Sequence, residues 1–159
     1  MIMVNQHIEI FCFTIDGIQF AVPLSTVDRV IRAVAVSPVP NAPKVIYGIF
    51  DYQGRVVAAI NLRHRLKLPE QPIAIDHVFI LAETQKRKLA LVADRADGIV
   101  VPASKDLINA SDLDSGFEAD GILRRDDGII LIYDIEKFLS ASEEIELQDA
   151  IANKNRIKN

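Results

Sequence analysis

One cysteine and three histidines are the first candidates in this chain for nucleophilic catalysis or zinc binding. A catalytic cysteine needs a lowered thiol pKa, which a helix N-terminus or a nearby cation supplies. Cys12 lies instead within an apolar run that predicts a strand, so we interpret it as a buried structural thiol. His7, His64 and His77 lack the short, paired spacing of a zinc site. We therefore expect no enzyme activity, no metal and no other cofactor, with a nucleophilic Cys12 as the minor alternative.

A second candidate ion site is the polar stretch 110–120. Asp112 and Asp114 precede Gly116, as acidic ligands precede the glycine of a calcium loop. A third ligand before the glycine and the closing Glu are both missing. The chain also has no Gly-rich phosphate loop and no Gly-x-Ser-x-Gly nucleophile turn. The stretch is therefore predicted to be an acidic surface loop.

Charge and composition argue against several classes of partner. The net charge is −4, and the basic clusters 63–65, 86–88 and 124–125 fall at turns or short helices. Aromatic residues make up only 6%, which leaves few stacking platforms for single-stranded nucleic acid. No apolar run reaches the roughly 18 residues that span a bilayer. We expect a cytoplasmic protein that binds no nucleic acid and does not insert into the membrane.

Hairpins dominate the predicted secondary structure. Apolar alternation and Gly-containing turns predict many short strands, in two groups separated by the linker-like stretch 69–76, which we expect to join two lobes. Strands are expected over residues 8–15, 18–22, 27–31, 78–83, 89–93 and 99–102, and hairpins over 48–62 and 122–132. Single helical turns are expected over 42–47, 63–66 and 104–108, and before Leu139. Ser140 and Glu143 have the spacing of a capping box and predict a C-terminal helix over about 141–153.

One pattern of glycines, turns and apolar runs occurs twice along the chain. The segment 48–66 is matched by 121–139, and the upstream segment 20–31 is matched by 89–100 at a nearly equal offset. Such a repeat indicates one β-unit built twice, in halves of approximately 8–68 and 76–140. Small closed barrels also remove exposed strand edges. We therefore expect residues 1–159 to form a single, mainly β domain of two small β-barrels sharing a core, with short helices and the C-terminal helix.

Several motifs occur in a distinctive order and spacing: Phe20-Ala-Val-Pro-Leu with Val27-Asp-Arg-Val-Ile, Val39-Pro-Asn-Ala-Pro43, the segment 48–66, Ala90-Leu-Val-Ala-Asp94 and Tyr133-Asp-Ile-Glu-Lys-Phe-Leu139. Together they resemble the CheW family of chemotaxis adaptors. This resemblance implies a monomer when isolated, because the second partner surfaces belong to other proteins. The resemblance covers residues 8–149 and implies two SH3-like β-barrels without enzyme activity. It implies a cytoplasmic adaptor, recruited to membrane-associated receptor arrays, that couples methyl-accepting chemoreceptors to a histidine kinase. A free-standing CheW-like regulator of another motility or two-component pathway is the alternative.

The resemblance also implies where the two partners would bind. The regulatory domain of the kinase would face a patch of five residues: Val27, Gly48, Gln53 and Gly54, with Arg29 beside them. The cytoplasmic tip of the chemoreceptor would lie in the groove between the barrels.

Two positions of this patch depart from the family pattern. The family usually reads Asn-Leu-Arg-Gly where this chain has Asp-Tyr-Gln-Gly at 51–54, and it usually carries an acid at the position of Arg29. If the two family residues normally interact, both have changed together here, which avoids an unpaired charge. The departures imply a divergent or accessory adaptor, in which Arg29 meets Asp51 or a carboxylate on a partner.

Overall fold

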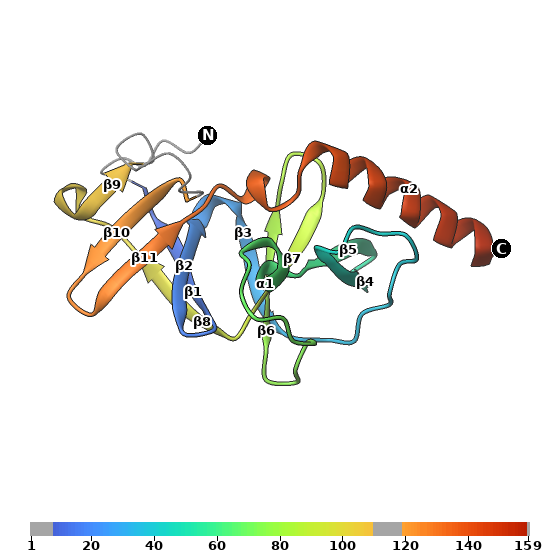
Figure 1. Ribbon diagram of the computed structural model, residues 1–159, viewed down its shortest axis with the longest axis horizontal. Helices are drawn as coiled ribbons and strands as arrows, with labels where there is room; N and C mark the ends of the chain where they lie inside the picture. Colours follow the sequence, from blue (N-terminus) through green and yellow to red (C-terminus); the bar gives the residue numbers. More distant parts are fainter. Residues whose placement is uncertain (1–7, 110–118, 159) are drawn as a thin grey trace.

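Two β-sheets lie side by side in the computed structural model, which describes residues 8–109 and 119–158 (Figure 1). The first sheet has six strands in the order β8–β1–β2–β11–β10–β9, and the second has five in the order β3–β6–β7–β5–β4. We call them the six-strand lobe and the five-strand lobe. The predicted mainly β fold is confirmed.

The bounds of the elements follow from the sequence pattern of short apolar runs and turns. The six-strand lobe contains β1 (Ile10–Ile15), β2 (Ile18–Pro23), β8 (Arg95–Val100), β9 (Leu107–Asn109), β10 (Gly121–Arg125) and β11 (Gly128–Ile132). The five-strand lobe contains β3 (Val27–Arg32), β4 (Ile46–Tyr52), β5 (Arg55–Ile60), β6 (Val78–Glu83) and β7 (Lys88–Ala93). The helices are η1 (Leu24–Thr26), α1 (Leu62–Arg65), η2 (Ser104–Asp106), η4 (Ile135–Phe138) and the C-terminal α2 (Ala141–Lys158).

Each half of the chain begins in one lobe and ends in the other. Strands β1 and β2 lie in the six-strand lobe, β3 to β7 lie in the five-strand lobe, and β8 to β11 return to the six-strand lobe. The strand order is the same in both lobes when β1, β2, β3, β4 and β5 are matched with β6, β7, β8, β10 and β11. Strand β2 pairs in parallel with β11, and β7 pairs in parallel with β5, at equivalent places. The sequence repeat is therefore a structural repeat whose two copies exchange strands.

The halves 8–68 and 76–140 consequently do not each build one lobe. The expectation that 69–76 joins the lobes is wrong, because this stretch connects α1 to β6 within the five-strand lobe. The chain crosses between lobes at η1 and at Asp94, between β7 and β8. The physical reason is the parallel pairing at the centre of each sheet, which cannot be made by a tight hairpin and here joins strands from opposite halves.

Three apolar clusters fill the two lobes and the space between them. The cluster within the six-strand lobe contains Ile10, Cys12, Ala21, Leu123, Ile130 and Ile132, and the cluster within the five-strand lobe contains Val57, Ala59, Phe79, Leu81, Ala90 and Val92. Five positions of each cluster are equivalent in the repeat; Leu123 and Val92 are the exceptions. The largest cluster takes side chains from both lobes, among them Phe13, Phe20, Ile80 and Leu91. This shared core is the one that the sequence predicts.

A buried ion pair also ties the lobes together. Arg63 of α1 is buried, and its Nη2 donates to both carboxylate oxygens of Asp94 at 2.6 and 2.8 Å. Asp94 also accepts from the backbone N–H of Asp16, in the β1–β2 turn, at 2.9 Å. Buried His77 lies 3.4 Å from Asp94 through its Nε2. Since removing one partner leaves an uncompensated buried charge, this network fixes how the lobes meet.

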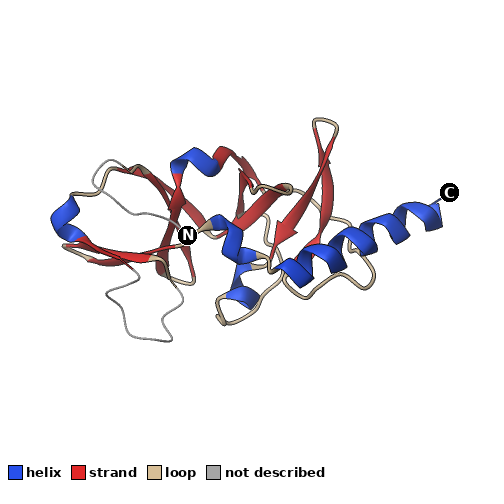
Figure 2. Ribbon diagram, turned by 90° about the horizontal axis from the view of Figure 1, so that it is seen from above, coloured by secondary structure: helices blue, strands red, loops and turns tan. Residues whose placement is uncertain are grey.

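The helices agree with the sequence in position more than in length. The Ser140 hydroxyl accepts from Glu143 N–H at 3.2 Å, and the Glu143 carboxylate accepts from Ser140 N–H at 2.8 Å, which confirms the capping box. Helix α2 continues to Lys158, beyond the predicted end, and runs along the five-strand lobe (Figures 1 and 2). No helix forms over 42–47, where two turns lead into β4. Within the described ranges, no helix has the length and apolar character needed to cross a bilayer.

Candidate protein-binding surface

The two edges of the five-strand sheet meet at a seam between β3 and β4. These strands stand at opposite ends of the strand order, yet Arg29 of β3 contacts Tyr52 of β4. The sheet must therefore curl until its edges approach, as the predicted barrel requires. We call the surface formed by Arg29, Tyr52 and the β4–β5 turn the β3–β4 seam.

Arg29 is exposed at this seam and is held by an aromatic partner. Its Nη1 donates to the Tyr52 hydroxyl at 3.0 Å, and its guanidinium carbon lies 5.9 Å from the centroid of the Tyr52 ring. Such a contact holds a planar cation without neutralising it. Asp51 does not take this role, since its Oδ1 accepts from the Gly54 N–H at 3.0 Å. Of the two partners that the sequence left open for Arg29, the structure thus gives no support to Asp51.

Gln53 and Gly54 form the tip of the hairpin beside Arg29. Their φ angles are +52° and +83°, and Tyr52 pairs with Arg55 directly across the turn. Two consecutive residues with positive φ are typical of the two-residue turn that matches the twist of a hairpin. Gln53 is exposed, so its side chain points away from the core and is available to a partner.

Gly48 and Val27 lie deeper than a contact patch requires. Gly48 is buried, and a Cβ at this position would lie 2.5 Å from the Ser37 carbonyl oxygen. Close approach of the 33–37 segment therefore explains the glycine. Val27 is half-buried and packs against the shared core. The structure thus brings Arg29, Gln53 and Gly54 to one surface, whereas Gly48 is buried and Val27 is half-buried. A binding role for all five remains a prediction.

A cleft that the sequence did not predict lies next to the seam. It has a volume of about 610 Å³ and lies between the end of β3, the segment after it and β4. Its lining is mostly apolar: Ile31, Arg32, Val34, Ala35, Ser37, Ile49, Phe50, Asp51 and Tyr52. The available signal was the Ala-Val-Ala-Val run at 33–36, which continues the apolar character of β3 up to the first of three closely spaced prolines.

The residues considered for catalysis or metal binding are dispersed. Cys12 is 1% exposed, and burial raises the pKa of its thiol to about 11, so the thiolate nucleophile is scarce at neutral pH. His77 is buried at the lobe junction, while His64 lies partly exposed on α1. Among the described residues, no group of three or more His, Cys, Asp or Glu is placed to hold a metal ion. His7 and the calcium-like stretch at Asp112 and Asp114 lie outside the described residues.

Comparisons with known proteins agree with this fold. A family model described as the CheW-like domain matches residues 9–143. The chain is 23% identical over 144 residues to chemotaxis protein CheW of Rhizobium meliloti, covering 89% of this chain and 93% of that protein. It is 25% identical over 148 residues to chemotaxis protein CheW of Thermotoga maritima, covering 92% and 95%.

A solved structure gives the same result for the fold. The scaffolding protein TtCheW from Thermoanaerobacter tengcongensis superposes with a TM-score of 0.76 at 19% identity, covering 86% of this chain and 95% of that chain. The family match spans both lobes and ends in the first turn of α2. The chain therefore belongs to the CheW-like family of non-enzymatic chemotaxis scaffold and adaptor proteins.

Proposed function

We propose that this adaptor binds the regulatory domain of a chemotaxis histidine kinase and the cytoplasmic tip of a chemoreceptor, and so couples receptor state to kinase activity. Several relatives that match nearly the whole chain bear the name chemotaxis protein CheW, which supports a role in chemotaxis. The protein forms and breaks no covalent bonds in its partners. It acts by binding two partners at once. Its place of action is the cytoplasmic side of receptor arrays, and it is a single-domain monomer when isolated.

The observation that carries this proposal is the exposed β3–β4 seam. Arg29 and Tyr52 stand together at its surface, beside Gln53 and Gly54. Arginine and tyrosine are enriched among the residues that dominate binding energy at protein interfaces. Because Tyr52 holds the guanidinium in place, less side-chain entropy is lost when a partner docks. The kinase regulatory domain is proposed to bind here, over the patch of Val27, Arg29, Gly48, Gln53 and Gly54.

The receptor tip is proposed to use a groove where the two lobes meet. The groove has a volume of about 410 Å³ and lies between α1, which follows β5, and η4, which follows β11. Leu66, Tyr133, Phe138 and Leu139 give it an apolar side, and Arg65, Glu136 and Lys137 give it a polar rim. A mixed lining of this kind suits an amphipathic helix laid into a groove.

Binding of purified protein to the kinase regulatory domain and to receptor-tip fragments of its own organism tests the proposal. We expect both to bind, and we expect Arg29→Glu combined with Gln53→Arg to keep the fold while strengthening binding to a kinase domain that recognises the usual family charges. Arg124→Glu, at an exposed residue near the end of β10 in the other lobe, is the control and should leave kinase binding unchanged. No binding to either partner would rule out the adaptor function.

Gln53 in place of the family arginine favours one second candidate, a CheW-like regulator of another signalling pathway. This candidate predicts that neither the kinase domain nor the receptor tip binds. It also predicts that a different signalling protein from the same organism binds at the β3–β4 seam and is lost in the Arg29→Glu variant. Co-purification from the native organism, followed by direct binding of the purified partner, distinguishes the two.

A further inference from the structure

We infer that the gap beside the β3–β4 seam binds an extended, acidic strand segment of a protein partner, added edge to edge along β4. The inference rests on the proposed adaptor function for the identity of that partner. The mode of binding follows from backbone pairing, cleft lining and charge in the five-strand lobe.

The gap is the open edge of β4 that borders the cleft. It begins where the backbone pairing between the 33–37 segment and β4 stops after a single residue pair. Ser37 and Ile49 exchange two hydrogen bonds, of 2.8 and 2.9 Å, as an antiparallel bridge. Two residues further along each edge, Ala35 and Asp51 line opposite sides of the 610 Å³ cleft instead of pairing. On the other side of the bridge, the C=O of Val39 accepts from the Ala42 N–H at 3.2 Å in a turn and does not continue the ladder. On this edge, β4 therefore has no backbone-paired strand from Phe50 onward among the described residues, although the Tyr52 side chain contacts Arg29.

Backbone groups of β4 face this gap without partners. The N–H and C=O of Ile49 point toward Ser37, and successive residues of a strand alternate, so those of Asp51 point to the same open side. Among the described residues, no hydrogen bond reaches the backbone N–H or C=O of Asp51 from that side. An added strand supplies one acceptor and one donor there, which is the basis of edge-to-edge recognition.

The lining of the cleft selects apolar side chains from such a segment. Ile31, Val34 and Phe50 contribute its apolar walls, and Val34 is 43% exposed. Since side chains of a strand alternate between two faces, every second residue of the added segment would enter the cleft. The other residues would face the rim.

The charges at the rim select acidic residues. Arg29 and Arg32 stand exposed on the β3 side, and neither bonds a carboxylate within the described part of the chain. Asp51 is the acid in the cleft lining, and its Oδ1 accepts a hydrogen bond from the Gly54 N–H. Carboxylates on the rim-facing positions of a partner segment would pair with the two guanidinium groups. The preferred occupant is thus an extended segment in which apolar and acidic residues alternate.

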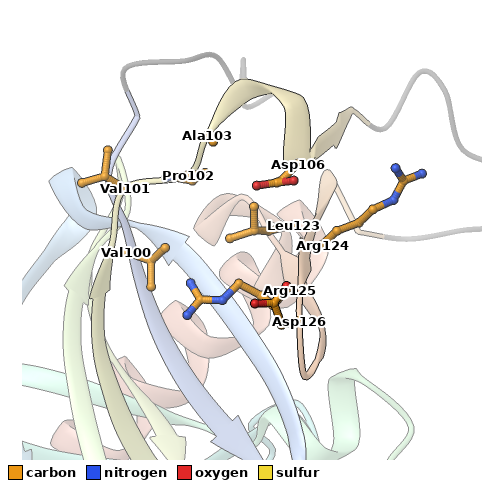
Figure 3. Close-up of a pocket in the computed structure, with 9 residues that line it drawn as sticks. All are labelled: Val100, Val101, Pro102, Ala103, Asp106, Leu123, Arg124, Arg125 and Asp126. Carbon is orange, nitrogen blue, oxygen red and sulfur yellow. The ribbon is translucent and has the colours of Figure 1, made fainter.

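The equivalent cleft of the six-strand lobe serves as an internal control. It has a volume of about 430 Å³ and is lined by acids and bases, Asp106 and Asp126 with Arg124 and Arg125 (Figure 3). Figure 3 shows Arg125 extending into the cleft toward Val100 and Arg124 pointing away from it. Leu123 and Ala103 stand at the positions of Phe50 and Val34 and are smaller, and four charged residues share the lining with them. An alternating apolar and acidic segment should therefore not bind in this cleft.

The test uses the full-length protein and three synthetic peptides of about seven residues, the length of an ordinary strand. The first alternates valine and glutamate, the second replaces glutamate by lysine, and the third is the first with alternate amides N-methylated. In an NMR titration we expect the glutamate peptide to bind at least about tenfold more tightly than either of the others. Its binding should slow amide exchange at Asp51.

Two variants locate the site. Val34→Asp places a charge in the cleft and should weaken the glutamate peptide by about tenfold or more. Ala103→Asp, on the lining of the six-strand cleft, is the matched control and should leave the affinity unchanged. Equal affinity of the three peptides, unaltered exchange at Asp51, or equal weakening by both variants would overturn the inference.

The failure of this inference and that of the adaptor function are distinguishable. If the peptide binds at the gap but the kinase domain and receptor tip do not bind, strand addition stands and the adaptor function falls. If the kinase domain binds through Arg29 while no peptide binds, only strand addition falls.

Discussion

The two lobes share one strand order but differ at the outer edges of strands β10 and β4. In the six-strand lobe, β9 pairs with β10 over three residue pairs, whereas in the five-strand lobe the equivalent contact is the single Ser37–Ile49 bridge. Four charged residues line the adjoining cleft in the six-strand lobe, whereas two charged residues line it in the five-strand lobe. Positions that agree between the lobes therefore describe the fold, and positions that differ identify the surface available for binding.

Prolines follow the single bridge of the five-strand lobe. Pro38, Pro40 and Pro43 come directly after Ser37, on the side away from the cleft, and fix φ there. The corresponding part of the other lobe is η2 followed by β9, which runs to Asn109 without a proline. The two lobes thus differ in sequence at the segment that pairs with β4 in one lobe and with β10 in the other.

The largest expected effect tests whether both lobes depend on one shared core. Phe13 of β1 is fully buried there, and the equivalent position of β6 holds the much smaller Ala82, also fully buried. Phe13→Ala should reduce the free energy of unfolding by about 3–5 kcal/mol, because it leaves a cavity between the lobes.

Urea denaturation followed by fluorescence and by circular dichroism measures this loss. Val56→Ala, at a half-exposed position of β5, is the control and should cost less than about 0.5 kcal/mol. If the lobes were independent, Phe13→Ala would split the unfolding transition into two, which would contradict a shared core.

The next effect concerns the backbone contact that closes the five-strand lobe. Gly48→Ala should destabilise the protein by about 1–3 kcal/mol, since a Cβ would collide with the Ser37 carbonyl and open the bridge. Gly17→Ala meets no atom within 4 Å and should cost about 1 kcal/mol, through its φ of +77° alone.

The amide resonances of the bridge distinguish the two glycine variants. Gly48→Ala should shift the amide resonances of Ser37 and Ile49, whereas Gly17→Ala should leave both in place. An unperturbed bridge in a stable Gly48→Ala protein would contradict the structural reason given for this glycine.

Local signals in the sequence predicted most elements and the repeat. Turn residues such as Asp16–Gly17 and Gln53–Gly54 fix hairpins through their backbone preferences alone, and the capping box at Ser140 and Glu143 fixes the start of α2. Which lobe receives each strand could not be predicted in this way. That choice depends on the parallel pairs β2–β11 and β5–β7, which join residues far apart in the chain.

Only part of the candidate surface could be predicted, because the rest depends on contacts between residues far apart in the chain. Arg29 and Gln53 stood out as departures from a family pattern, and they do lie at one seam. Tyr52 as the partner of Arg29, and the cleft beside it, depend on how far the sheet curls. No local pattern encodes that curvature, so the sequence named Asp51 as the nearby partner.

The smallest expected effect concerns a β-bulge that lies at equivalent positions of the two lobes. Asp28 is the extra residue where β3 pairs with β6, and Asp97 is the extra residue where β8 pairs with β1. Partial burial opposes ionisation of Asp97, but hydrogen bonds from Arg95, Thr14 and Gln19 outweigh it, so the pKa of Asp97 lies below its ordinary value. A hydrogen bond from Lys88, with the charge of that residue, lowers the pKa of Asp28 as well.

A lowered pKa in the folded state stabilises the protein above the unfolded value, about 3.9 for aspartate, and this stabilisation is lost as the pH falls through the folded value. Asp97→Asn should therefore cost about 1–2 kcal/mol at neutral pH and flatten the fall in stability below about pH 4. Asp28→Asn should change both quantities less, because water screens an exposed carboxylate. Thermal unfolding of the two variants between acid and neutral pH measures the difference. Equal effects would show that the bulges, like the cores, are equivalent in the two lobes, and that the lobes differ only along the seam.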